Sequence, residues 1–192
     1  PKRQALLARV FAPPAILVWL AGATFCHAME HPQFDKQTIS ADSGRIALGD
    51  INGNGSADVV VHHWGSDRGQ VWDGTLTWYE WPSWSAHTVR TDADFFGDEV
   101  LVADLDTDGD KDIITCRGND SSAQDYWYEN LDGTGTTWQE HLLGGTTGSE
   151  IKAMAVADLD GDGKRDVVSR RKALLVIWHQ DSPTSWTSRQ IA

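Results

Sequence analysis

Apolar residues alternate with other residues at three places along the chain, each just before a run of acidic residues. They lie four and two positions before Asp50, Asp104 and Asp158, as the pairs Ile46 and Leu48, Val100 and Val102, and Met154 and Val156. A period of two is typical of a β-strand with one buried face. The residue directly before each aspartate is small: Gly49, Ala103 or Ala157. The pattern predicts three equivalent strands that each enter an acidic loop.

Each acidic run is followed by an apolar segment and then by two segments rich in aromatic residues. Turns rich in Gly, Ser and Asp separate these segments, as expected between short strands. Tryptophans recur in both aromatic segments, at Trp78, Trp127 and Trp178 and then at Trp84, Trp138 and Trp186. We expect these rings to pack between neighbouring units. Each unit therefore reads as four short strands, and the fold class is predicted to be all-β, with β-propeller blades of four antiparallel strands.

The three acidic runs share one pattern, with oxygen-bearing side chains at the first, third, fifth and ninth positions and Gly at the sixth. Their first aspartates are residues 50, 104 and 158, so the spacing is 54 residues each time. Alternate side chains in such a turn converge on one centre, and Gly permits the positive φ that a tight turn requires. Oxygen ligands select a hard cation. The loops 50–58, 104–112 and 158–166 therefore predict up to three Ca²⁺ sites.

The predicted ligands are the side chains at the first, third, fifth and ninth positions and the backbone carbonyl at the seventh. They are Asp50, Asn52, Asn54, Ser56 and Asp58; Asp104, Asp106, Asp108, Asp110 and Asp112; and Asp158, Asp160, Asp162, Lys164 and Asp166. An EF-hand is excluded because the twelfth position is Val61, Thr115 or Ser169, where an EF-hand needs Glu. The first loop replaces two carboxylates by amides, so we expect it to bind calcium most weakly.

These loops, with the Trp-Tyr-Glu segments at Trp78 and Trp127 and the Trp-x-x-His segments at Trp84 and Trp138, resemble the FG-GAP or VCBS repeats of integrin-α-type and bacterial extracellular β-propellers. The resemblance covers residues 34 to 191. It implies structural calcium sites, a ring of about seven blades, and ligands bound at the opposite face or in the central funnel. Three repeats are too few for such a ring, so we expect further blades or self-association to complete it.

The first 28 residues read as a signal peptide. Lys2, Arg3 and Arg9 precede an apolar stretch that ends at Phe25, and cleavage is expected after Ala28. The stretch is shorter than the roughly 20 residues of a spanning helix, so no membrane span is expected in the mature chain. Residues 29–192 then form the propeller segment, which we expect to be secreted or extracytoplasmic. The formal net charge of −12 argues against nucleic acid and anionic membranes as partners.

A few residues of the first unit have no counterpart in the other two and are candidates for ligand contact: His62, His63, Trp64, Trp72 and Trp81. Exposed tryptophan rings anchor sugar faces and protein partners. The sequence contains no nucleophile elbow, phosphate loop or zinc-ligand cluster. It therefore favours a calcium-binding extracellular module for a protein or glycan partner. The alternative is the N-terminal part of a secreted carbohydrate-active enzyme, of the polysaccharide lyase or sugar dehydratase type, in which His62 or His63 transfers a proton.

Overall fold

The computed structural model describes residues 36–39, 44–63, 74–92, 99–118, 123–145, 151–172 and 174–191. The chain divides into two compact units, Pro1–Gln37 and Thr38–Ala192. The predicted signal peptide at 1–28 lies outside the described residues. The strands of the described residues lie in the second unit. They are β1 (Gly44–Gly49), β2 (Asp58–His63), β3 (Gly74–Glu80), β4 (Ser85–Asp92), β5 (Val100–Ala103), β6 (Asp112–Arg117), β7 (Gln124–Asn130), β8 (Trp138–Gly145), β9 (Ile151–Ala157), β10 (Asp166–Arg171), β11 (Leu175–Ser182) and β12 (Ser185–Ile191).

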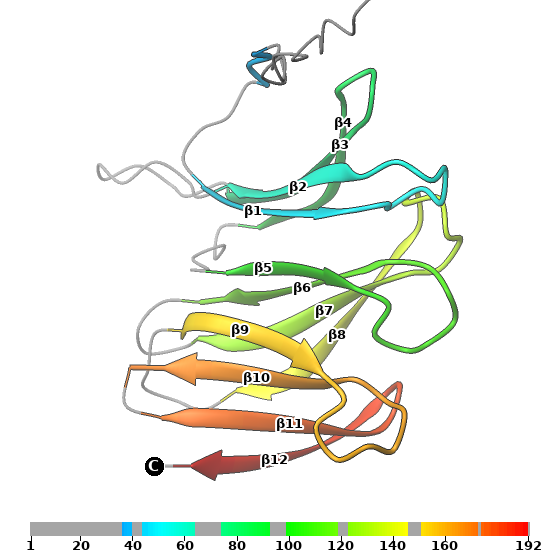
Figure 1. Cartoon of the computed structure of the whole chain (residues 1–192). Coiled ribbons are helices and arrows are strands. Elements are labelled where there is room, and N and C mark those ends of the chain that lie inside the picture. The colour runs from blue at the N-terminus through cyan, green and yellow to red at the C-terminus, as the bar shows by residue number, and fades with distance from the viewer. Residues whose placement is uncertain are drawn as a thin grey trace, which may run out of the picture. The chain divides into compact units, whose positions relative to one another are not determined.

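The strands form three separate antiparallel sheets of four strands each, β1–β4, β5–β8 and β9–β12, with the strands in chain order (Figure 1). Each acidic loop joins the first and second strands of its sheet. The loops are closed by the same strand pair in each case, Gly49 with Asp58, Ala103 with Asp112, and Ala157 with Asp166. The structure thus confirms an all-β fold built from blade-like sheets, with the element order that the sequence repeat predicts.

Two clusters of buried side chains hold neighbouring sheets together. One joins the first sheet to the second and includes Val60, Trp78 and Val100. The other joins the second sheet to the third and includes Trp127 and Met154. At both interfaces, burial of β-branched and aromatic side chains contributes most to holding the sheets together. Sheets of this kind therefore depend on their neighbours to cover their faces.

The third tryptophan of the repeat does not occupy the position that the sequence suggests. Val60 pairs with Trp78 and Ile114 with Trp127, but the equivalent Val168 pairs with Ile177. Trp178 is one residue further along the strand, in register with Tyr79 and Tyr128. Successive strand residues point to opposite faces, so a shift of one residue changes the face. All three rings are buried as predicted, but Trp178 faces the second sheet, whereas Trp78 and Trp127 face the sheet that follows their own.

The first strand of the first sheet also differs from its prediction. Ile46 and Leu48 were expected to lie on a buried face, and both are exposed. Their counterpart Val100 is buried because the first sheet packs against it, and Met154 is buried against the second sheet in the same way. No sheet precedes β1 within the described part of the chain, so the alternating pattern has no covering layer there.

The described residues contain no helix with the length and apolar character that crossing a bilayer requires.

Candidate metal centre

The ninth-position aspartates fix the shape of all three loops. Asp112 is fully buried, and its two carboxylate oxygens accept the backbone N–H of Leu105 at 2.8 Å and of Asn130 at 3.0 Å. Asp58 and Asp166 make the corresponding two contacts in their own sheets. One oxygen therefore ties the start of the loop and the other ties the end of the third strand. These carboxylates lie beneath the loops, with both oxygens already engaged by backbone amides.

The remaining odd-position side chains turn the loop backbone around a common centre. In the first loop Asp50 accepts the N–H groups of Asn54 and Gly55, at 2.9 and 2.8 Å, and Asn54 accepts that of Ser56 at 2.8 Å. In the third loop Asp158 accepts the N–H of Gly161 at 2.7 Å and that of Gly163 at 3.0 Å. Such side-chain to backbone bonds specify the turn locally.

The second loop gathers the densest set of carboxylates. Oxygens of Asp104, Asp106 and Asp108 all lie within 4.8 Å of one another. One buried oxygen of Asp104 and one of Asp110 have no hydrogen-bond partner in the structure. Buried carboxylate oxygens without partners are costly, and a hard cation is the ligand that removes this cost. The all-oxygen donor set and the two unpartnered oxygens therefore fit calcium.

Burial and crowding raise the pKa values of three carboxyl groups in the second loop. Burial, together with the neighbouring Asp108, raises the pKa of Asp110 to about 7. Burial raises the pKa of Asp112 to about 7 as well, against the lowering effect of the two backbone amides that it accepts. The pKa of Asp106 is also raised, by burial first and by the charges of Asp108 and Glu129. The second loop therefore holds more negative charge than its surroundings tolerate without a cation.

The third loop has a different donor set, because a histidine from β11 joins it. Oxygens of Asp160 and Asp162 and a nitrogen of His179 lie within 4.8 Å of one another. The ammonium of Lys164 already pairs with Asp162 at 2.6 Å. By strand register His179 is equivalent to Glu80 and Glu129. Each of these residues comes directly before the one whose backbone amide the ninth-position carboxylate accepts. The sequence analysis did not include this strand position among the ligands, although it is an acidic residue in two of the three repeats.

The raised pKa values predict how the stability of the metal-free chain depends on pH. Asp110 and Asp112 have a pKa of about 7 in the folded chain against an ordinary value of 3.8. The folded state therefore binds protons that the unfolded state has released, and this stabilisation is complete below about pH 4 and lost as the pH rises to about 7. We expect the urea midpoint in chelator to fall between about pH 5 and pH 7.5. Asp110→Asn should weaken this dependence, and a midpoint that rises over the interval would contradict it.

The candidate ligand contacts of the first unit are not brought together at one surface. His62 is fully buried between the first and second sheets, where its Nδ1 lies 3.2 Å from the hydroxyl of Thr115. His63 is half-buried, with Nε2 3.2 Å from the hydroxyl of Tyr79. Trp81 is exposed and its ring meets that of Trp84 edge to face at 5.1 Å. Trp64 and Trp72 lie outside the described residues.

The two repeated histidines have structural roles. His87 stacks on Trp78 with ring centroids 4.2 Å apart, and His141 stacks on Trp127 at 4.4 Å. His141 also contacts Glu129 at 2.6 Å. Stacking on a buried tryptophan covers the outer face of that ring.

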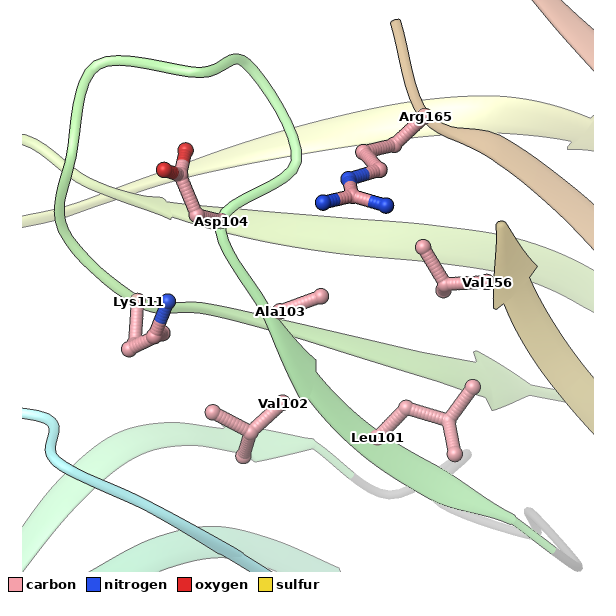
Figure 2. Close-up of a pocket in the computed structure, with 7 residues that line it drawn as sticks. All are labelled: Leu101, Val102, Ala103, Asp104, Lys111, Val156 and Arg165. Atoms are coloured by element: carbon pink, nitrogen blue, oxygen red, sulfur yellow. The ribbon is translucent and has the colours of Figure 1, made fainter. Parts of the chain in front are cut away.

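A cavity of about 360 Å³ lies between the second and third loops, along the edge strands β5 and β9 (Figure 2). Leu101, Val102 and Val156 supply its apolar lining. Figure 2 shows the cationic side chains of Lys111 and Arg165 on opposite sides of it. The carboxylate of Asp104 also lines the cavity. The two cationic groups outnumber this one carboxylate, in a chain with an excess of acidic residues, so the cavity is locally suited to an anionic ligand.

No curated protein matches the chain. Residues 104–169 match a family described as the FG-GAP-like repeat. This span begins at the first aspartate of the second loop and ends within β10, so it contains all the loop aspartates of the second and third loops. It runs through the interface of the second and third sheets. The chain therefore carries an FG-GAP-like repeat at residues 104–169, and its four-stranded antiparallel sheets are β-propeller-like blades.

Proposed function

We propose that the chain is a secreted, calcium-stabilised β-propeller segment that serves as an extracellular interaction module for a protein or glycan. The observation that carries this proposal is the second loop, where oxygens of Asp104, Asp106 and Asp108 lie within 4.8 Å of one another and two buried carboxylate oxygens lack hydrogen-bond partners. The FG-GAP-like repeat supports an extracellular setting.

In this proposal each loop holds one calcium ion. The second loop supplies Asp104, Asp106 and Asp108 directly, with Asp110 beside them. Calcium supplies positive charge that offsets the repulsion between these carboxylates. For sites with dissociation constants of about 0.1 to 1 mM at about 1 mM calcium, binding stabilises the folded state by about 0.4 to 1.4 kcal/mol per site.

Thermal unfolding with calcium and with chelator tests the cation dependence. We expect a higher midpoint in calcium, because the cation binds the folded loops and has no comparable site in the unfolded chain. Asp108→Asn should reduce the calcium-induced shift more than any other single change, because the second loop has the strongest charge crowding. Equal midpoints in calcium and chelator would contradict the proposal.

The first loop allows the opposite test, in which substitutions are expected to strengthen calcium binding. Changing both Asn52 and Asn54 to Asp gives this loop the same carboxylates as the second loop at the first, third, fifth and ninth positions. We expect its calcium affinity to rise by about tenfold or more. Calorimetry would then detect an additional strong site, whereas unchanged affinity would show that the first loop geometry does not support binding.

The cavity beside the second loop is the proposed contact site for a ligand that carries carboxylates. Lys111 and Arg165 would pair with the carboxylates, and the apolar lining would cover the neighbouring carbon atoms. Oligoglucuronate is the probe. We expect it to bind the wild type and to lose about tenfold in affinity when Lys111 and Arg165 are both changed to Gln. The exposed Lys172 provides the control as Lys172→Gln, and equal loss in this variant would contradict a local site.

A further inference from the structure

The second loop and the cavity beside it share one side chain. Asp104 is the first-position aspartate of the loop, and its carboxylate has an oxygen within 4.8 Å of oxygens of Asp106 and Asp108. The same carboxylate lines the cavity of about 360 Å³, together with Lys111 and Arg165 (Figure 2). Asp104 therefore belongs both to the proposed calcium site and to the proposed contact site for a carboxylate ligand.

The two cationic side chains of the cavity come from equivalent positions in successive loops. Lys111 and Arg165 stand at the eighth positions of the second and third loops, directly before the buried aspartates Asp112 and Asp166. Backbone amides hold those two aspartates, so the residues before them have fixed places in the fold. Among the described residues, neither Lys111 nor Arg165 forms an ion pair with a carboxylate. Their positive charges therefore act on the cavity.

Among the described residues that line this cavity, Asp104 alone is acidic. One of its oxygens is buried and has no hydrogen-bond partner within the described part of the chain. Without a cation in the loop, its negative charge opposes the charges of Lys111 and Arg165. Calcium brings two positive charges beside Asp104, and a bound cation of this kind outweighs the single charges around it. The cavity is therefore more positive when the second loop holds calcium.

We infer that calcium binding in the second loop and anion binding in the cavity strengthen each other through Asp104. The inference rests on the proposed function, which supplies a ligand for each site, and adds a regulation of the cavity by calcium. When the loop is occupied, the carboxylate of Asp104 binds the cation and no longer weakens the attraction of Lys111 and Arg165 for an anion. A ligand that carries carboxylates would thus be held in calcium-rich surroundings and released where calcium is scarce.

The coupling has to be reciprocal, because both binding steps share one coupling free energy. The factor by which calcium raises the affinity for the anion therefore equals the factor by which the anion raises the affinity for calcium. Asp104 is half-buried, so salt screens its charge only in part. We expect a factor of about five at physiological salt, the lower end of the usual range for coupled sites.

Calorimetry on the whole chain at one fixed ionic strength tests the inference, with oligoglucuronate as the probe. We expect the probe to bind about fivefold more tightly in saturating calcium than in chelator, and calcium to bind the second loop more tightly by the same factor when the probe is present. The heat of mixing probe and calcium without protein is subtracted. Equal probe affinity in calcium and in chelator would overturn the coupling and leave the contact site in place, whereas no binding in either would overturn both.

Two substitutions in the loop separate coupling through Asp104 from a calcium ion that bridges loop and ligand. Asp104→Asn removes the carboxylate from the cavity, so its affinity for the probe in chelator should reach about that of the wild type in calcium. Asp108→Asn also weakens the calcium site, but Asp108 does not line the cavity, so its gain in chelator should be smaller. A bridging ion predicts the opposite result, a loss of probe binding in Asp104→Asn.

Asp132→Asn is the control for net charge, since Asp132 is exposed in the turn between β7 and β8 and lies outside both sites. It should keep the wild-type affinity for the probe. We expect Asp104→Asn to keep at least the wild-type thermal midpoint in chelator, because one charge is removed from a crowded loop. The comparison of the wild type in calcium and in chelator depends on no variant. Weak probe binding by Asp104→Asn in chelator, or an equal gain in Asp132→Asn, would overturn the inference.

Discussion

Replacing Arg171 by methionine is expected to lower the free energy of unfolding by about 3 to 5 kcal/mol. Arg171 and Asp125 form an ion pair at 2.9 Å across the interface of the second and third sheets, and both side chains are fully buried. The same carboxylate accepts the indole N–H of Trp178 at 2.7 Å and the hydroxyl of Ser169 at 3.2 Å. Without the guanidinium a carboxylate is left buried with only neutral partners, and urea unfolding measures the loss.

Two further measurements separate this ion pair from a general packing defect. Burial raises the pKa of Asp125 and Arg171 opposes that rise, so the loss in Arg171→Met should be larger at about pH 8 than at about pH 5, where the carboxyl can bind a proton. Leu76 stands at the position of Asp125 in the first sheet. Adding Asp125→Leu should therefore restore most of the stability. Arg170→Met, at an exposed neighbour, is the control, and a loss there equal to that at Arg171 would contradict the ion-pair explanation.

Replacing Gly135 by alanine is expected to cost about 2 to 4 kcal/mol, the second largest effect. Gly135 has a φ of +71°, and an added Cβ would lie 2.7 Å from Cγ2 of Ile51 and 2.9 Å from Cζ2 of Trp78. Its carbonyl also accepts the indole N–H groups of Trp78 and Trp138. The turn between β7 and β8 therefore packs closely against the first sheet at Gly135. Any side chain at this position would push the first and second sheets apart.

Gly55→Ala is the matched control for this substitution. Gly55 has a φ of +87° and no atom within 4 Å of an added Cβ, so it carries the backbone strain without the clash. Urea unfolding of both variants in chelator should give a loss of about 1 kcal/mol for Gly55→Ala. Equal losses would show that strain alone accounts for Gly135.

The strand content and the loops could be predicted because they depend on local pattern. The alternation before Asp50, Asp104 and Asp158 and the fixed loop spacing act within a few residues, so strand and loop positions follow directly from the sequence. The position of Trp178 could not be predicted in this way. Its register is set by Gln180, whose backbone N–H bonds to Asp166 across the sheet, and the distance in sequence between the loop and the third strand varies between repeats.

The parts of the site that were missed depend on contacts between sheets or between distant strands. His179 reaches the third loop from β11 through its pairing with β10, and no spacing within the loop indicates it. Asp125 and Arg171 lie far apart in sequence and meet only when two sheets pack. The exposure of Ile46 and Leu48 has the same origin, because burial on a sheet face is decided by the neighbouring layer.

The two core clusters couple each sheet only to its neighbour along the chain. Each cluster joins one sheet to the next, and neither extends over all three sheets. The second junction contains a buried charged pair, Arg171 with Asp125. The ion pair across the first junction, Arg90 with Glu140 at 3.6 Å, is partly exposed, and His62 there contacts the uncharged Thr115. In the nearest-neighbour description of repeat proteins, the unit with the weaker junction opens at lower free energy than the others. Amide hydrogen exchange should then be fastest in β1 to β4, and the folding cooperativity of the chain would reside in its second and third sheets.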